Sequence, residues 1–481
     1  MNVEKQTPIP FLMLFYAALM VSLSAAEKPN IIIVFNDDMG YRDLGCFGTP
    51  LIKTPRVDQM AKDGMRFTDF YVASPVCSAS RASLLTGCYH NRVGVGGVFF
   101  PNRGHVGLDP KHVTIAEVLK TVGYKTKAVG KWHLGDEKEF LPTNQGFDSY
   151  YGIPYSNDMT PARSMEYSMD CLFREGVTLE KLNEAFNGSS NDIRRGFKNK
   201  VPLMRDEKCI EMPADQRTIT QRFASEGIEF ISESLKEDKP FFLYLANSMP
   251  HTPLFVSSEF DGKSKGGLYG DVIEEIDFNF GRILDHLKKL KIEDNTLVVF
   301  TSDNGSWLIK GDHGGNALPL FEGKMTHFEG GQRVPTIIKW PGKTPSGSVC
   351  HEMALTMDLL PTLAHITGAA LPTEMSLDGK NIIDLITGKK GAKTPHKYFF
   401  FGTSAVRSGN WKYHRVEKFK VKATARKTKG PTLYNLKDDI GESKNVIADH
   451  PGIAKRLKKA LESNPNVKPG AAKRKKSGNK K

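Results

Sequence analysis

Closely spaced cysteine pairs are missing from this chain. Its 481 residues include only six cysteines, at positions 46, 77, 88, 171, 209 and 350. None of them has the short paired spacing of a zinc site, and disulfide partners cannot be assigned from their spacing. The cysteines therefore give no support to a zinc module.

A membrane-spanning run is also missing. The one long apolar segment, from Phe11 to Ala26, is shorter than the ~20 residues that a spanning helix needs. It follows Lys5 and ends in Ser24-Ala25-Ala26, a small-residue cleavage site. We expect residues 1–26 to be a secretory signal peptide, no membrane span, and a periplasmic or extracellular protein.

Acidic residues are scarce near the C-terminus. The formal net charge is +13, and the tail from Lys468 to Lys481 holds seven Lys or Arg and no acid. Another basic stretch, from Arg415 to Lys429, is broken only by Glu417. No basic motif with interleaved aromatics accompanies this charge, so no nucleic-acid partner is expected. We interpret residues 468–481 as a basic disordered tail that can retain the protein on sulfated polysaccharide.

Hydrophobic and charged contents of 39% and 25% are those of an ordinary globular protein. The chain is longer than one core usually serves, so a large domain and a smaller one are expected. Strand-like runs alternate with helical patterns. Strands are predicted at 30–35, 125–129, 240–246 and 296–300, and helices at 55–65, 114–122, 218–235, 271–290 and 352–368.

This alternation predicts an α/β fold with a large, mostly parallel sheet flanked by helices. Beyond about Pro372 the pattern changes to short strands at 398–401, 411–414 and 433–436, followed by a helix at 451–463. We expect a catalytic domain at 27–371 and a smaller domain at 372–467 with an antiparallel sheet and one helix.

Polar groups follow four of the predicted strands. Asp37 and Asp38 follow the first strand, and Asp303 and Asn304 follow the strand at 296–300. Ligands bind beyond the carboxyl ends of parallel strands. These four side chains offer only oxygen, which suits a hard cation, Ca²⁺ or Mg²⁺.

The second set of polar groups is cationic. Lys131 and His133 follow the strand at 125–129, His251 follows the strand at 240–246, and Arg81 and Lys324 stand elsewhere in the chain. Such donors suit an anionic group held between a metal and side chains. We expect the two sets to face each other.

The run at 77–87 reads CSASRASLLTG and begins with a cysteine at the mouth of a predicted helix. Ser80 supplies a hydroxyl and Arg81 a guanidinium. Helix N-termini and cations favour anions and acidify thiols. We therefore expect an acidified Cys77 thiol in a site for a negatively charged substrate.

This run resembles the signature of the sulfatase family, Cys-x-Pro/Ala-Ser-Arg followed by Leu-Leu-Thr-Gly. The resemblance extends over roughly Pro29 to Asn445. It implies an alkaline phosphatase-like fold and a sulfuric ester hydrolase that acts on organic sulfate esters, with a sulfated carbohydrate as the expected substrate. It also implies that a maturation enzyme oxidises Cys77 to formylglycine (3-oxoalanine), whose hydrate attacks sulfur.

The resemblance assigns a role to each site residue. The Ca²⁺ ligands would be Asp37, Asp38, Asp303 and Asn304, with Asp303 also a candidate base. The hydrated aldehyde would be surrounded by Arg81, Lys131 and His133. The substrate would be held by Lys131, Ser156, His251 and Lys324, the last two assisting the leaving oxygen. Residues 329–335 resemble the family's glycine turn.

Two positions depart from the family's usual pattern. Ala79 stands where the most familiar signature has proline, a position that the maturation machinery reads, and Cys88 stands where a basic residue is usual. Two alternatives stay open. One is a phosphomonoester or phosphonate hydrolase of the same superfamily, and the other is a catalytically silent binder of sulfated glycans.

Overall fold

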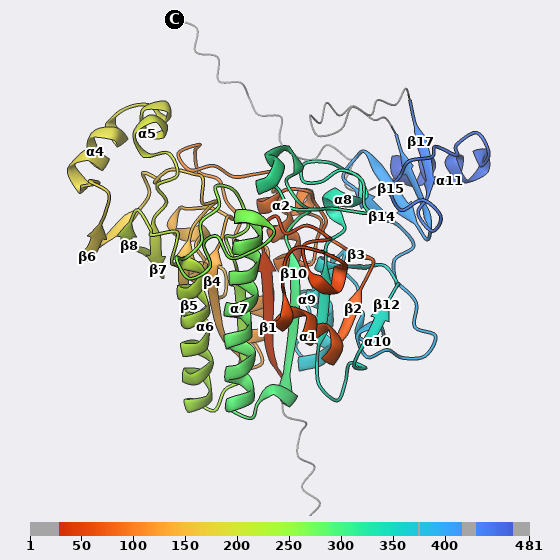
Figure 1. Ribbon diagram of the computed structural model, residues 1–481, viewed down its shortest axis with the longest axis horizontal. Coiled ribbons are helices and arrows are strands. Elements are labelled where there is room, and N and C mark those ends of the chain that lie inside the picture. The colour runs from red at the N-terminus through yellow and green to blue at the C-terminus, as the bar shows by residue number, and fades with distance from the viewer. Residues whose placement is uncertain (1–27, 374–375, 416–429, 465–481) are drawn as a thin grey trace, which may run out of the picture.

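The computed structural model describes residues 28–373, 376–415 and 430–464 (Figure 1). The predicted signal peptide at 1–26, the basic stretch after Arg415 and the tail at 468–481 lie outside these residues. Among the described helices, none combines the length and the apolar character needed to cross a membrane.

The centre of the fold is a run of five parallel strands. In spatial order they are β10 (Thr296–Ser302), β1 (Asn30–Asn36), β9 (Phe241–Ala246), β4 (Lys125–Lys131) and β5 (Ser149–Ile153). All seven residues of β1 and all seven of β10 are buried, and so are most residues of β4. This burial is expected for strands that are covered on both faces of the sheet. The predicted parallel sheet is therefore confirmed.

Shorter strands extend this sheet on both sides into a mixed sheet of eleven strands. Beyond β10 lie β11 (Thr336–Lys339), β2 (Met65–Phe67) and β12 (Ser348–Cys350), and β11 is antiparallel to both of its neighbours. Beyond β5 lie β7 (Leu203–Arg205), β8 (Lys208–Met212) and β6 (Glu166–Phe173).

Between β6 and β7 the chain forms two helices, α4 (Leu179–Asn187) and α5 (Ser190–Phe197). In Figure 1 these helices stand away from the central sheet, above strands β6 to β8. We refer to residues 166–212 as the arm.

Helices cover both faces of the sheet. On one face α1 (Pro55–Asp63), α6 (Ile219–Lys236) and α7 (Gly267–Lys289) share a core with Ile32, Val34 and Leu243. On the other face α2 (Cys77–Thr86), α3 (Ile115–Lys120), α9 (Leu359–Thr367) and the short α10 (Ile383–Ile386) pack with Ile31 and Ile33. Successive residues of β1 thus point to opposite cores.

The C-terminal region forms a second, antiparallel sheet. Its strands β14 (Phe399–Phe401), β15 (Ala405–Ser408), β16 (Trp411–His414) and β17 (Thr432–Asn435) are consecutive neighbours. Helix α11 (Pro451–Glu462) covers one face through Leu457 and Leu461. The other face packs Phe399 and Phe401 against Tyr71 of β3 (Phe70–Tyr71). The predicted small sheet with one helix is confirmed.

A buried network of charges joins the two sheets. The Glu329 carboxylate, on the short helix α8 (Glu329–Gln332), lies 3.0 Å from the Lys412 Nζ of β16 and also contacts Arg333 and the Tyr71 hydroxyl. Lys412 lies 3.0 Å from Glu442 as well. Burial opposes ionisation of Glu329, but the charges of Lys412, Arg407 and Arg333 lower its pKa to about 2.

Two of the predicted helices extend over residues that form strands in the structure. The helix expected at 352–368 begins only at Leu359, because Ala354 and Leu355 form β13 beside β3 and the Asp358 carboxylate accepts the Leu355 N–H. The helix expected at 55–65 ends at Asp63, and Met65 belongs to β2. Strand β15 and the strands of the arm had no counterpart among the predictions.

Candidate active site

The carboxyl ends of the five parallel strands bring the predicted polar residues to one edge of the sheet. Asn36 of β1 lies beside Ser302 of β10, so the residues that follow these strands are neighbours. The Asp38 backbone N–H accordingly donates a hydrogen bond to the Asp303 Oδ1 at 3.1 Å. The Asn304 amide donates to the Asp38 Oδ1 at 2.7 Å. The four predicted metal ligands therefore form one cluster.

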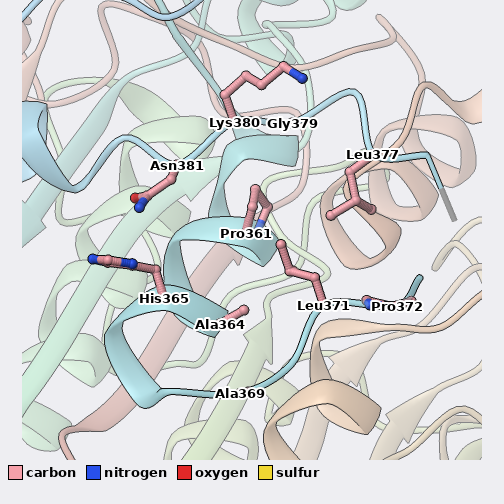
Figure 2. A pocket seen from close by; sticks show the side chains of 10 residues that line it. All are labelled: Pro361, Ala364, His365, Ala369, Leu371, Pro372, Leu377, Gly379, Lys380 and Asn381. Atoms are coloured by element: carbon pink, nitrogen blue, oxygen red, sulfur yellow. The ribbon is translucent and has the colours of Figure 1, made fainter.

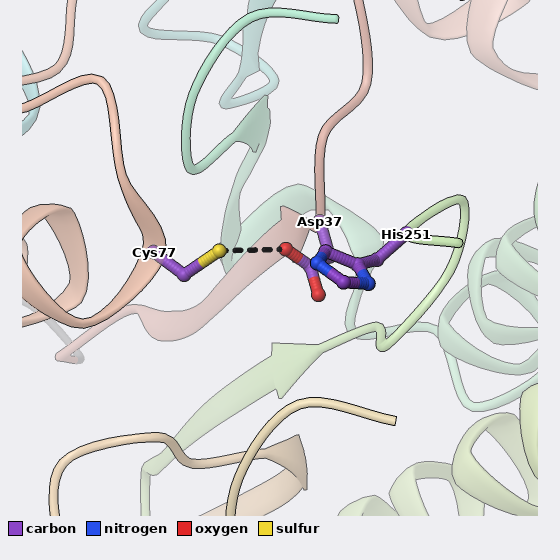
Figure 3. Close-up of side chains that lie close together, drawn as sticks. All are labelled: Asp37, Cys77 and His251. Carbon is purple, nitrogen blue, oxygen red and sulfur yellow. Dashed lines mark hydrogen bonds between the residues drawn. The ribbon is translucent and has the colours of Figure 1, made fainter. Parts of the chain in front are cut away.

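Cys77 lies beside this cluster as the first residue of α2. Its Sγ donates to the Asp37 Oδ1 at 3.3 Å and lies 3.3 Å from the Lys324 Nζ. Figure 3 shows Cys77 and His251 on opposite sides of Asp37. The sulfur and one carboxylate oxygen each of Asp37, Asp38 and Asp303 all lie within 4.8 Å of one another. The predicted helix start and the oxygen ligands thus meet at Cys77.

The expected acidity of the Cys77 thiol is wrong. Complete burial raises its pKa, and the neighbouring carboxylates of Asp303 and Asp37 raise it further. The charges of Lys131 and Lys324 oppose this rise without overcoming it. The helix N-terminus is present as predicted, but the sequence did not show that the thiol would be enclosed with carboxylates.

Three cations balance the three carboxylates. The Arg81 Nε and Nη2 both donate to the Asp303 Oδ2, at 3.1 and 2.8 Å. The Lys131 Nζ lies 2.6 Å from the Asp37 Oδ2, and the Lys324 Nζ lies 2.6 Å from the Asp38 Oδ1. All of these side chains are nearly or fully buried. The two expected sets of charges therefore contact each other directly.

The oxygen cluster fits a hard cation. The Asp38 Oδ2 and the Asn304 Oδ1 are buried and have no hydrogen-bond partner among the described residues. Buried polar atoms are nearly always satisfied, so two orphaned oxygens in one cluster indicate a missing partner. Carboxylate and amide oxygens are preferred ligands of Ca²⁺ and Mg²⁺.

The pKa values of the aspartates diverge. Burial opposes ionisation of Asp37, but the charges of Lys131 and Arg81 hold its pKa well below its usual value. Burial and then the charge of Asp37 raise the pKa of Asp303 to about 7. A divalent cation would offset this repulsion between the carboxylates.

The two histidines are neutral imidazoles. Burial and the nearby cations hold the pKa values of His133 and His251 well below the usual value. The His133 Nε2 lies 3.0 Å from the Phe99 carbonyl oxygen, which fixes that nitrogen as the N–H donor. Its Nδ1 is buried and unpartnered among the described residues, so it can accept a proton.

The remaining predicted residue, Ser156, lies in the loop after β5. Its Oγ accepts from the Lys131 Nζ at 3.1 Å and lies 3.3 Å from the His251 Nε2. Ser156 thus contacts two of the other residues that the sequence placed at the substrate, Lys131 and His251.

Two side chains of the site were missed from sequence. The Asn157 Oδ1 lies 3.0 Å from the His251 Nδ1. The centroid of the Trp307 ring lies 5.2 Å from that of the His251 ring and 4.6 Å from the Lys324 Nζ. Asn157 directly follows the predicted Ser156, and Trp307 lies three residues after Asn304, so proximity to predicted site residues was the available signal.

Two site residues adopt left-handed backbone conformations. Asp38 has φ of 67° and His133 has φ of 62°. Such conformations are uncommon for residues with a Cβ and persist where the surroundings enforce them. These two residues lie just after β1 and β4, where the chain turns away from the strand ends.

The predicted glycine turn packs against the loop that carries part of the oxygen cluster. A Cβ on Gly305 would lie 1.7 Å from the Gly330 carbonyl oxygen, so this crossing requires glycine. Gly305 follows Asn304 directly, and its N–H donates to the Gly331 carbonyl at 3.1 Å. The turn at 329–335 therefore supports the loop that carries Asn304.

A separate hollow lies between α9 and residues 369–372 and 377–381 (Figure 2). Its lining includes His365 and Lys380 but no carboxylate and none of the site residues above. The chemistry described here lies elsewhere, at the strand ends.

The comparisons with known proteins agree with the geometry. A family model described as sulfatase matches residues 29–369, and one described as N-sulphoglucosamine sulphohydrolase, C-terminal, matches residues 318–466. Arylsulfatase A of Homo sapiens is 36% identical over 469 residues, which cover 92% of this chain and 88% of that protein.

N-acetylgalactosamine-6-sulfatase of Canis lupus familiaris is 35% identical over 425 residues, which cover 84% of this chain and 74% of that protein. A solved structure described as Ps i-CgsB in complex with k-i-k-neocarrahexaose has a TM-score of 0.75 and 32% identity. The match covers 91% of this chain and 92% of that one.

Proposed function

Because the chain belongs to the sulfatase family and is thus a sulfuric ester hydrolase, we propose that it hydrolyses sulfate esters of carbohydrates with formylglycine at position 77 and one Ca²⁺ ion. The observation that carries this proposal is the cluster around Cys77. There a helix N-terminus, three carboxylates and three cations converge within one buried site.

Asp37, Asp38, Asp303 and Asn304 would hold the Ca²⁺. When bound, the ion would polarise the sulfate group of the substrate. The hydrated aldehyde, once formed from Cys77, would supply the attacking hydroxyl. The orphaned oxygens of Asp38 and Asn304 support this ligand set. Lys131 favours the ionised form of Asp37 and orients it through their contact at 2.6 Å, and Arg81 orients Asp303 through their contact at 2.8 Å.

Proton transfer falls to residues on either side of Cys77. His133 is the acceptor, because its imidazole is neutral and its buried Nδ1 has no partner among the described residues. Lys324 is the proton donor to the departing oxygen. The nearby Asp38, Cys77 and Asp37 raise the pKa of Lys324 against the effect of burial, so the ammonium form persists.

His251 orients the substrate beside Lys324. Its imidazole is neutral and is held by Asn157 at 3.0 Å and Ser156 at 3.3 Å. A neutral imidazole in that setting donates one hydrogen bond without adding a charge. Lys131, Ser156, His251 and Lys324 together would bind the sulfate group.

A sulfated glycan is the substrate class we favour. The complex of Ps i-CgsB with an oligosaccharide and the resemblance to N-acetylgalactosamine-6-sulfatase support it. The strongly basic composition is favourable for a polyanionic partner. We further propose export through residues 1–26 and conversion of Cys77 by a maturation enzyme that accepts Ala79.

The decisive experiment is a substrate panel together with the mass of the peptide that contains Cys77. Defined sulfated mono- and oligosaccharides, an aryl sulfate and phosphate esters would be scored by released sulfate or phosphate. Conversion of thiol to aldehyde removes sulfur and hydrogen and adds oxygen, which the peptide mass reports. Preference for phosphate esters would support the phosphohydrolase alternative, and an unconverted, inactive protein that binds sulfated glycan would support the silent binder.

A further inference from the structure

A cavity of about 540 Å³ lies next to the site described above. Five segments line it, namely residues 100–103, 158–160, 190–199, 252–253 and 310–313. The third of these segments belongs to the arm and includes α5. The cavity therefore combines loops at the strand ends with a part of the chain that the central sheet does not require.

This cavity shares its inner wall with the active site. Thr252 and Pro253 follow His251 directly, and the Asn157 side chain that contacts His251 also donates to the Pro253 carbonyl at 2.9 Å. Lys310 at the rim lies over the same Trp307 ring as Lys324, at 4.2 Å from its centroid. A group that leaves toward Lys324 and His251 therefore departs into this cavity.

The lining of the cavity is predominantly cationic. Arg103, Arg194, Lys198 and Lys310 line it, against the single carboxylate of Asp158. Across residues 28–373, 376–415 and 430–464, no carboxylate oxygen lies within 4.0 Å of a charged nitrogen of Arg103, Arg194 or Lys198, whereas the adjacent Arg195 forms an ion pair with Asp192 at 3.0 Å. These three cations are thus available to a ligand.

Further polar and apolar atoms of the lining also suit a sugar. The Thr252 Oγ1 and the Asp158 Oδ1 are buried without a hydrogen-bond partner among the described residues. Phe100 is 53% exposed and Met159 contributes apolar surface. Unpaired polar atoms beside an apolar face are what hydroxyls and the carbon face of a pyranose ring would complement.

We propose that this cavity binds the sugar that carries the cleaved sulfate, and that Arg194 and Lys198 bind a second anionic group on the same oligosaccharide. Arg194 belongs to the last turn of α5 and Lys198 is the residue that follows this helix, and both line the cavity. The second group is a sulfate or a uronate carboxylate, both of which accept charge-assisted hydrogen bonds. The inference rests on the proposed function and specifies its substrate as polyanionic.

The test compares kcat/KM for four substrates. These are a small aryl sulfate, a singly sulfated disaccharide, its analogue with a second sulfate and its analogue with a uronate. The Arg194→Ala and Lys198→Ala variants should lower the ratio of kcat/KM for a doubly anionic over the singly sulfated disaccharide by roughly 10- to 100-fold, the worth of one charge-assisted contact. Arg195→Ala is the matched control and should leave this ratio unchanged.

The ratio separates recognition from folding. An equal loss on all four substrates, or no loss on any, overturns the inference while the hydrolase assignment stands. If no sulfate ester is hydrolysed, the proposed function fails. In that case the affinity for the doubly sulfated disaccharide, measured by calorimetry, decides the inference. Arg194→Ala should weaken this affinity by roughly 10- to 100-fold.

A second, independent observation concerns two cysteines of the arm. The Cys171 Sγ on β6 lies 3.9 Å from the Cys209 Sγ on β8, and these strands are parallel neighbours. Cys209 is buried and Cys171 is partly exposed. We infer that an external disulfide oxidant joins them, breaking two S–H bonds and forming one S–S bond while the oxidant is reduced to two thiols.

This disulfide would fasten the arm at its base. Incubation with glutathione disulfide followed by alkylation and non-reducing peptide mapping tests it. We expect one linked peptide pair containing Cys171 and Cys209, and a glutathione adduct on Cys171 in the Cys209→Ser variant. Recovery of both thiols in alkylated form, or linkage of either to Cys46, Cys88 or Cys350, would overturn the assignment.

Discussion

Replacing Glu329 by glutamine should remove a large part of the stability that the buried charge network provides. Glutamine keeps the shape of the side chain and removes its charge. The usual pKa of 4.5 falls to about 2 in the folded protein. At about 1.36 kcal/mol per pKa unit, ionised Glu329 stabilises the folded state by about 3 kcal/mol at neutral pH.

This contribution has a defined pH dependence. Because the folded-state pKa is depressed, the stabilisation is fully present above about pH 4.5 and disappears as the pH falls toward about 2. Glu329→Gln should therefore lower the free energy of unfolding by about 3 kcal/mol at pH 7. For a chain of this length the thermal midpoint would fall by roughly 3 °C. The difference should shrink steadily below pH 4.5.

Glu293→Gln is the matched control. Glu293 pairs with Lys339 at 2.5 Å, but its side chain is 31% exposed, so its loss should cost less than about 1 kcal/mol. Chemical denaturation of wild type and both variants between pH 7 and the lowest pH at which all three fold would give the comparison. A Glu329→Gln loss no larger than that of the control, or one independent of pH, would refute the reasoning.

Three further outcomes follow from the active site and the charge distribution. Cys77→Ala should abolish sulfate release while circular dichroism and the thermal midpoint stay close to wild type, since a small side chain is removed; turnover near the wild-type rate would contradict the proposed nucleophile. Chelation should remove activity, and added Ca²⁺ should restore it. Asp38→Ala should lose both the metal, as measured by elemental analysis, and the activity. Stoichiometric zinc in active protein would contradict the hard-cation argument. Salt should reduce activity on sulfated oligosaccharides more steeply than activity on a small aryl sulfate, since charge attraction is screened over roughly 8 Å at physiological ionic strength. Parallel salt profiles for the two substrates would argue against electrostatic recruitment. Deletion of residues 468–481 should weaken retention of the protein on sulfated polysaccharide.

The sequence predicted the cluster at the sheet edge because parallel strands end on the same side. Asp37 and Asp303 are 266 positions apart, yet β1 and β10 are neighbours and their carboxyl ends coincide. Lys324 is a different case. It stands in a loop beyond β10 where no periodicity marks it, and only the resemblance to a family singled it out.

Burial is what the sequence did not show. The Cys77 thiol was expected to be acidic from its helix N-terminus, but full enclosure with Asp37 and Asp303 reverses the effect. Lys412 is an ordinary polar residue in a short strand pattern, and only the fold places its ammonium between two buried carboxylates. The strands of the arm were not predicted for a related reason, since β6 and β8 pair across more than thirty residues.

The left-handed backbone at Asp38 and His133 sets stability and catalysis against each other. A residue with a Cβ in this conformation typically costs about 1 kcal/mol or more relative to glycine. A library randomised at these two positions and selected for thermal resistance should drift toward glycine or asparagine. The same library selected for turnover should return aspartate and histidine, so the two selections together would identify the positions at which this fold gives up robustness for reactivity.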